Sequence, residues 1–249
     1  MLKTRVIPTL TIKDLRLVKS TQFGEHRNIG SIIAAVRVFN ARDVDEMIVL
    51  DLDGRENGLK SNMLQEITKE CFMPLTLGGG VRTLEDITCL LTLGADKVSI
   101  NTEAVRNPKL IEEAARQFGS QCVVVSIDAK KTENGYEVMV EGGKVPTGLS
   151  PIAWAREAKR RGAGEILLTS IDHDGMMDGY DVELVKSVSA AVSLPVIACG
   201  GAGALDDFAR VIGEGGASAV SAASIFQYTE VTPNMIKVHL KEAGFEVRL

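Results

Sequence analysis

The segment Val123-Val124-Val125-Ser126-Ile127-Asp128-Ala129-Lys130 decides the fold of this chain. Its four β-branched apolar residues are typical of a strand that is buried on both faces, as in a parallel sheet. The strand runs into a carboxylate, and parallel β/α folds carry their chemistry at the carboxyl ends of their strands. Asp128 is therefore a candidate catalytic residue, although a capping role in the next turn would also explain it.

Similar apolar runs recur along the chain and alternate with amphipathic helical patterns. Eight strand–helix units within 249 residues predict a single (β/α)8 TIM barrel that occupies residues 1–249. A doubly wound open sheet is the alternative, but the Gly-x-Gly-x-x-Gly turn that usually opens such a sheet is not present. We expect the strands to begin near Arg5, Glu46, Leu75, Lys97, Val123, Glu165, Val196 and Ala219.

Local signals between these runs mark turns and helix starts. Ser150, Asn107 and Thr232 each precede a proline, and a capping side chain before a proline predicts the first turn of a helix. Thr83 with an acidic residue three positions later predicts a capping box. A short β-prone segment at 136–141, flanked by glycines, predicts a hairpin inserted after the fifth strand.

Composition excludes several classes of protein. The net charge of −5 argues against nucleic acid as a partner, because binding to phosphate backbones requires clustered Lys and Arg. The amino terminus lacks an apolar signal core, and no apolar run approaches the ~20 residues that span a bilayer. We therefore expect a cytoplasmic protein with no membrane contact, no metal and no cofactor. Scattered cysteines predict buried, reduced thiols; they are Cys71, Cys89, Cys122 and Cys199.

The chain repeats itself. Residues 74–87 match residues 195–208 without a gap, and residues 94–102 match residues 216–224. The third and fourth strand–helix units thus correspond to the seventh and eighth. We predict a twofold internal repeat of half-barrels, at approximately 1–120 and 121–249, which places paired features on opposite sides of the barrel mouth.

The paired features are of a kind that binds phosphate. Gly79-Gly80 and Gly200-Gly201 end equivalent strands and open short helices, where backbone N–H groups can approach an anion closely. Turns also need glycine, so either pair alone is weak evidence. Asn101-Thr102 and Ala223-Ser224 follow the neighbouring strands and add hydroxyl or amide donors. Two opposed anion sites predict an elongated substrate with a phosphate at each end.

The repeat also exposes an asymmetry. Residues 6–11 align with residues 123–128, so Thr11 is expected opposite Asp128. Two carboxylates in these places would supply a general acid and a general base on either side of a substrate. Here one half has the carboxylate and the other half has a hydroxyl.

Over essentially its whole length the chain resembles the cyclase subunits of imidazole glycerol phosphate synthase, which are (β/α)8 barrels of histidine biosynthesis. The resemblance implies an enzyme that takes ammonia from a glutaminase partner, as a heterodimer. It condenses ammonia with a bisphosphorylated ribulosyl substrate, giving imidazole glycerol phosphate and an aminoimidazole carboxamide ribotide. The matching segments are 7–8, 18–19, 78–80, 96–101, 126–130, 162–172, 200–203 and 247–249.

The resemblance also implies roles for particular residues. Asp128 would be one catalytic acid/base, Lys19 an active-site lysine, and Thr11 would occupy the position of the second acid/base. The phosphate ligands implied by the resemblance and the repeat are Gly79, Gly80, Asn101, Thr102, Asp174, Gly175, Gly200, Gly201, Ala223 and Ser224. Four charged residues at strand starts match a ring through which ammonia enters from the glutaminase, although a solvated rim would also explain them; they are Arg5, Glu46, Lys97 and Glu165.

The chain departs from the family at the first strand. The family reads Cys-Leu-Asp where this chain reads Thr9-Leu10-Thr11, and a threonine hydroxyl is no base near neutral pH without help. Losing one positioned acid/base typically costs ~10²–10⁴ in rate. Met176 also stands where the family usually has threonine, and Asp53-Gly54 is either turn chemistry or a lip of the active site.

Three functions therefore stay open. The first is an ammonia-dependent cyclase. The second is a paralogue, suggested by residues 71–74 and 197–200, that activates a glutaminase and passes ammonia to a sugar amidotransferase in the biosynthesis of surface polysaccharides such as lipopolysaccharide. The third is a sugar-phosphate isomerase of the sister histidine-pathway barrel, which also normally needs the first-strand aspartate.

Overall fold

Eight parallel strands form a closed barrel in a computed structural model that describes residues 3–42 and 44–249. β12 pairs with β1 and β7 pairs with β10, so the ring has no open edge and the open-sheet alternative is wrong. The predicted strand starts are confirmed, except that Glu46 lies one residue before its strand. The strands are β1 (Arg5–Lys13), β4 (Met47–Asp51), β5 (Leu75–Gly78), β6 (Lys97–Ile100), β7 (Val123–Thr132), β10 (Glu165–Ser170), β11 (Val196–Cys199) and β12 (Ala219–Ala222).

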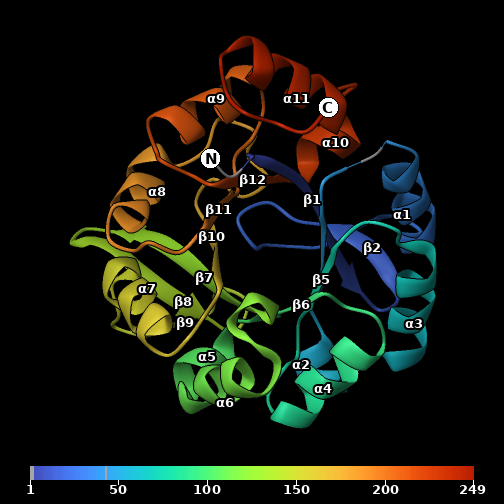
Figure 1. Cartoon of the computed structure of the whole chain (residues 1–249), viewed down its shortest axis with the longest axis vertical. Coiled ribbons are helices and arrows are strands. Elements are labelled where there is room, and N and C mark those ends of the chain that lie inside the picture. The colour runs from blue at the N-terminus through green and yellow to red at the C-terminus, as the bar shows by residue number, and fades with distance from the viewer. Residues whose placement is uncertain (1–2, 43) are drawn as a thin grey trace.

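Helices surround the strands and follow one another around the barrel in chain order (Figure 1). The prediction of a single (β/α)8 barrel is therefore confirmed. No helix in the described part of the chain is long and apolar enough to cross a membrane. The helices are α1 (Ile32–Ala41), α2 (Gly54–Asn57), α3 (Ser61–Glu70), α4 (Leu84–Thr92), α5 (Thr102–Arg106), α6 (Lys109–Phe118), α7 (Pro151–Arg160), α8 (Val182–Ser189), α9 (Leu205–Gly213), α10 (Ser224–Tyr228) and α11 (Pro233–Glu242), with a 3₁₀ turn at Ser120–Cys122.

Most of the predicted helix caps are present. The Thr83 hydroxyl accepts a hydrogen bond from the N–H of Asp86, whose carboxylate accepts from the N–H of Thr83. Ser150 and Thr232 cap α7 and α11. Asn107 was predicted as a cap, but its side chain makes no capping bond and α6 begins two residues later. Its N–H instead ends α5 by donating to the carbonyl of Glu103, because the two helices meet there.

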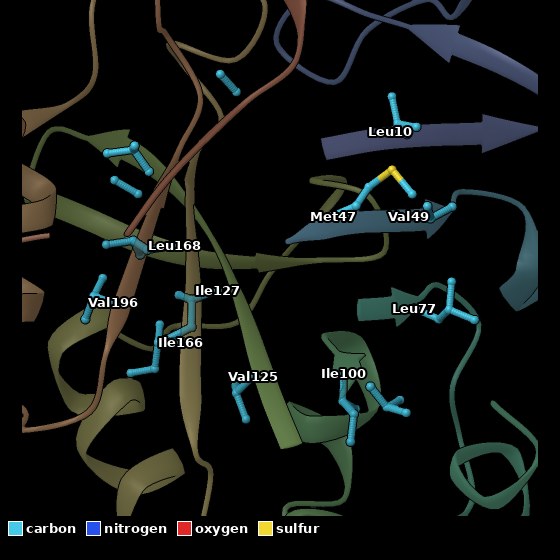
Figure 2. Close-up of a cluster of buried hydrophobic side chains, with 14 of the residues drawn as sticks. Leu10, Met47, Val49, Leu77, Ile100, Val125, Ile127, Ile166, Leu168 and Val196 are labelled. Atoms are coloured by element: carbon cyan, nitrogen blue, oxygen red, sulfur yellow. The ribbon is translucent and has the colours of Figure 1, made fainter. Parts of the chain in front are cut away.

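The core has two layers, separated by the wall of the barrel. Apolar side chains that point outward from the strands pack beneath the helices, and Figure 2 labels members of this layer on β1, β4, β5, β6, β7, β10 and β11. A smaller apolar cluster fills the interior, so the barrel is packed rather than an open pore. Its members are Ile7, Ile48, Val124, Leu167, Ile197 and Ala219.

A hairpin follows the first strand of each half. The predicted hairpin after the fifth strand is confirmed, since β8 (Gly135–Val140) pairs antiparallel with β7 and β9 (Val145–Pro146) pairs with β8. The equivalent hairpin of β2 (Arg16–Lys19) and β3 (Arg27–Gly30) was not predicted, because these strands have only four residues each and mix polar with apolar side chains. β2 pairs with β1, and this pairing carries Lys19 toward the mouth.

The thiols differ from their prediction in burial. All four are free, but each is only partly buried. Cys71 packs against the outer layer and Cys199 against the interior cluster, while Cys89 lies on α4 and Cys122 ends the 3₁₀ turn. They are Cys71, Cys89, Cys122 and Cys199.

Candidate functional site

The carboxyl ends of the strands gather three interacting ionisable groups. Asp128 follows the buried part of β7, and its Oδ2 accepts a hydrogen bond of 3.1 Å from Nδ2 of Asn101. Burial and the negative charge of Asp174 raise the pKa of the Asp128 carboxyl to about 7, although the bond from Asn101 opposes this. Burial lowers the pKa of Lys19, which is 6 % exposed, while Asp174 opposes that change. A carboxyl group with a pKa near 7 can both give and take protons at neutral pH.

Thr11 lies two residues before the end of β1, the strand opposite the one that carries Asp128. β1 and β7 are four strands apart in either direction around the barrel. The Thr11 hydroxyl is engaged, because its Oγ1 donates a hydrogen bond of 2.6 Å to the carbonyl of Val18 on β2. That bond helps to hold the hairpin that carries Lys19. Because residue 11 is a threonine, no carboxylate stands opposite Asp128 at this position.

The first predicted phosphate site lies at the ends of β5 and β6. Gly79 has φ +95°, and a Cβ atom there would lie 1.9 Å from the carbonyl oxygen of Asp51; one on Gly80 would lie 2.4 Å from the backbone of Gly54. Close packing against the loop after β4 thus requires both glycines, whether or not an anion binds. Beside them, the Thr102 hydroxyl donates to Oδ1 of Asn101 at 3.2 Å.

The second predicted phosphate site lies beyond β10, β11 and β12. A Cβ atom on Gly201 would lie 2.0 Å from the carbonyl oxygen of Gly179, and one on Gly175 would lie 2.4 Å from that of Ser20. Packing again explains these glycines, so anion binding at either place stays a prediction. The other expected ligands lie in the loops after these strands or at the start of α10; they are Asp174, Gly200, Ala223 and Ser224.

Four charged side chains close a ring at the opposite end of the barrel. Arg5 Nη1 lies 2.8 Å from Glu46, and Lys97 Nζ lies 3.0 Å from Glu46 and 2.9 Å from Glu165. Arg5 also pairs with Glu165, which completes a cycle of alternating charge. Burial alone would lower the pKa of Arg5, but its bonds to Glu165 and Glu46 outweigh burial and raise it. The four residues therefore form one partly buried network rather than separate rim charges.

A second charged cluster lies at the mouth around Asp53, which was expected to serve either the turn or the lip of the site; its partners Asp51 and Lys60 were not predicted. Lys60 Nζ lies 3.0 Å from Oδ1 of Asp51 and also pairs with Asp53. Burial, followed by the hydrogen bond with Asp53, raises the pKa of Asp51 to about 6. Nδ2 of Asn57 donates to Asp53 at 3.0 Å, so Asp53 holds its own loop in place. The sequence feature that could have predicted this cluster is the pair of aspartates at and just after the end of the apolar strand β4.

Comparison with known proteins assigns the chain to a family. The model of the family described as "Histidine biosynthesis protein" matches residues 5–232. The chain belongs to this family. It is 48 % identical to a protein of Hyphomonas neptunium named imidazole glycerol phosphate synthase subunit HisF, over all of this chain and 99 % of that protein. It is 45 % identical to a protein of the same name from Natranaerobius thermophilus, over the full length of both.

A matched pair of glycine substitutions tests the packing at the first predicted phosphate site. Gly58 also has positive φ, at +75°, but a Cβ atom there would contact nothing within 4 Å. Gly58→Ala should cost about 1–3 kcal/mol of unfolding free energy from backbone strain alone. Gly79→Ala should cost at least ~1–3 kcal/mol more, because the new methyl group overlaps Asp51. Chemical denaturation measures both, and equal costs would show that the contact with Asp51 is not tight.

The environment of Asp128 predicts a pH-dependent stability. Between pH ~4, the ordinary pKa of an aspartate, and about 7, the folded chain binds a proton that the unfolded chain has lost, so stability falls as pH rises. We expect Asp128→Asn to match the unmodified chain near pH 4 and to exceed it at pH 8, by on the order of 2–4 kcal/mol. Chemical denaturation at both pH values measures this, with Glu133→Gln in an exposed turn as the control. The same difference at both pH values would contradict the raised pKa.

Proposed function

We propose that the chain is a cyclase-type subunit of imidazole glycerol phosphate synthase. It would use ammonia from a glutaminase partner to form imidazole glycerol phosphate and an aminoimidazole carboxamide ribotide from a bisphosphorylated ribulosyl substrate. The observation that carries the proposal is the Asp128 carboxyl at the mouth, with a pKa of about 7 and electrostatic coupling through Asp174 to Lys19. The identity of 48 % and 45 % over the full chain to relatives that bear the synthase name supports the same reaction.

In this mechanism Asp128 moves protons during ring formation. Its pKa of about 7 leaves acid and base forms both populated at neutral pH. Burial lowers the pKa of the Lys19 amine, and the negative charge of Asp174 opposes that change. The two predicted phosphate sites would fix the ends of the substrate and place its reacting centre between Asp128 and Thr11.

The opposite end of the barrel suits a glutaminase. Alternate residues of a strand face the same side, so Lys97, which begins β6, and Asn101, which follows its last residue, both point into the barrel, one at each end. The charged ring would then stand between a docked glutaminase and the interior. Ammonia released by the partner would pass the ring and reach the mouth on the inside.

An exposed aromatic residue beside the ring would anchor that partner. The side chain of Phe72 is 87 % exposed and lies in the loop that leads into β5. β5 stands between β4, which follows Glu46, and β6, which begins at Lys97. The loop is fixed, because Oδ1 of Asn40 accepts from the N–H of Phe72 at 3.1 Å and Nδ2 of Asn40 donates to the carbonyl of Glu70. Buried aromatic anchors on rigid surfaces contribute strongly to protein interfaces.

Thr11 favours a second candidate function. Its hydroxyl donates to the carbonyl of Val18, and a threonine provides no carboxylate at the position opposite Asp128. In this alternative the chain activates the glutaminase and conducts ammonia to a sugar amidotransferase, with weak or absent cyclase activity. Ring formation without transfer of glutamine-derived ammonia to a sugar amidotransferase would favour the first candidate, and transfer to a sugar amidotransferase without ring formation would favour the second.

Replacing Thr11 tests the missing carboxylate. We expect slow cyclase turnover by the unmodified chain and a rise of ~10²-fold in Thr11→Asp, with little change in substrate affinity, because the added group acts on proton transfer. An ionised aspartate cannot donate to Val18, so the variant should also lose ~1 kcal/mol of stability. Turnover is followed with ammonium as the nitrogen source, and Thr11→Asn serves as the uncharged control. Equal activity in the Asp and Asn variants would exclude a carboxylate effect.

Opening the ring tests its role toward ammonia. Glu165→Gln keeps the size of the side chain and weakens its pairing with Arg5 and Lys97. We expect glutamine-driven turnover to fall. Ammonium-driven turnover, in which ammonia can enter from the mouth, should stay within about twofold of the unmodified chain. Glu157→Gln, which removes a carboxylate from a surface ion pair, is the control. An equal loss with both nitrogen sources would indicate a structural role.

Truncating Phe72 tests the docking face. Phe72→Ala should weaken binding of the glutaminase by ~2 kcal/mol or more, about 30-fold, since hot-spot aromatics contribute on that scale. Its stability should hardly change, because the side chain is exposed. Calorimetric titration of the partner measures the affinity, and Tyr228→Ala, at another exposed aromatic, is the control. Unchanged affinity would place the partner elsewhere.

A further inference from the structure

Three arginines from different elements meet beside the first predicted phosphate site. Arg55 lies in α2, Arg82 in the turn before α4, and Arg106 at the end of α5. Nη2 of Arg82 donates to the carbonyl of Arg55 at 2.6 Å. Arg106 pairs with Glu141, and Nη2 of Arg55 lies 4.0 Å from the same carboxylate oxygen. Among residues 3–42 and 44–249, Glu141 is the one carboxylate in an ion pair with any of the three, which leaves an excess of two positive charges.

Backbone contacts tie this arginine cluster to the residues expected to hold phosphate. A Cβ atom on Gly80 would lie 2.9 Å from the backbone nitrogen of Arg55. Arg106 is in the same short helix as Thr102. The N–H of Glu141 donates to the Thr102 hydroxyl at 3.0 Å. The cations and the carboxylate therefore stand at the rim of the first site rather than on a separate surface.

Glu141 is held in this position by its backbone. It lies in the turn between β8 and β9 with φ +56°, a left-handed conformation that is uncommon for a residue with a side chain. Its side chain is about one-third exposed, as is that of Arg55, so neither is locked by packing. A carboxylate held between two guanidinium groups and released by rotation of its own side chain occupies the position of an exchangeable anion.

We propose that Arg55, Arg82 and Arg106 form an anion subsite of the first phosphate site, which Glu141 occupies until a phosphate monoester displaces its carboxylate. The location rests on the proposed function, because it takes the Gly79-Gly80 region as a phosphate site. Guanidinium groups bind phosphate through paired, charge-assisted hydrogen bonds. A monoester carries about −1.5 to −2 charges at neutral pH and a carboxylate carries one, so the monoester neutralises more of the charge of the three guanidinium groups once Glu141 has left. The cluster would therefore select dianionic monoesters over monoanionic diesters and carboxylates.

Binding of ribose 5-phosphate to the full chain tests the subsite. The backbone amide signals of Gly80 and Thr102 in nitrogen-15 NMR report the first site separately from the second. Glu141→Gln removes the competing charge and keeps the N–H that binds Thr102. We expect this variant to bind the probe about tenfold more tightly at these signals, and Arg106→Met and Arg55→Met to bind it at least tenfold more weakly.

Two controls keep the outcome decisive. Glu157→Gln and Arg160→Met alter an ion pair on α7, and neither should change binding of the probe. In the double variant Glu141→Gln, Arg106→Met, most of the increase in affinity for ribose 5-phosphate caused by Glu141→Gln should disappear, because that increase requires the guanidinium group of Arg106. Unchanged or weaker binding by Glu141→Gln, in a chain whose thermal unfolding is intact, would overturn the proposal and make Glu141 a structural brace.

The test is separate from the test of the proposed function, because binding of ribose 5-phosphate needs neither ammonia nor ring formation. Tighter binding by Glu141→Gln in a chain without cyclase activity would support the subsite and count against the cyclase. Cyclase activity combined with no effect of Glu141→Gln would sink the subsite alone.

Discussion

Closure of eight parallel strands around a small apolar cluster is the constraint on which the rest of this structure depends. Parallel strands need both faces covered, and a ring without edges leaves only the helices outside and the packed interior inside. The interior cluster, which includes Ile48, Val124 and Leu167, separates the two ends of the barrel. Charged and polar groups can therefore gather at either end without sharing one solvent-filled space.

Because alternate residues of a strand face the same side, each strand presents inward-facing residues at both ends of the barrel. Arg5, Ile7, Thr9 and Thr11 alternate along β1 on the same inner face, so a single strand carries a ring residue, a core residue and a mouth residue. At about 3.3 Å per residue, Arg5 and Thr11 are separated by roughly 20 Å along the strand. The proposed path of ammonia would run from the ring to the mouth along the inside of the wall, past the interior cluster that separates the two ends.

The two halves of the barrel use the same plan with different side chains. Each first strand continues into an antiparallel hairpin, and the two hairpins contribute to opposite sides of the mouth. One hairpin carries Lys19, and the turn of the other carries Glu141 between arginines. The hydroxyl of Thr11 holds the first hairpin, whereas Asp128 on the equivalent strand keeps its carboxyl for the mouth. Equivalent positions thus carry a hydroxyl that supports a hairpin in one half and, in the proposed mechanism, a carboxyl that moves protons in the other.

The sequence by itself determined the number, order and starts of the strands, because buried parallel strands are continuous apolar runs and the repeat fixes their correspondence. It also placed Asp128, the glycine pairs and the ring residues at the correct ends of their strands. Only the tertiary structure decided which of these residues touch. The closed cycle from Arg5 to Glu165, the packing of Gly79 on Asp51 and the pairing of Glu141 with Arg55 and Arg106 join segments that are distant in the chain. Such contacts depend on strand register and hairpin geometry, which local patterns do not specify, and the β2–β3 hairpin was missed for the same reason.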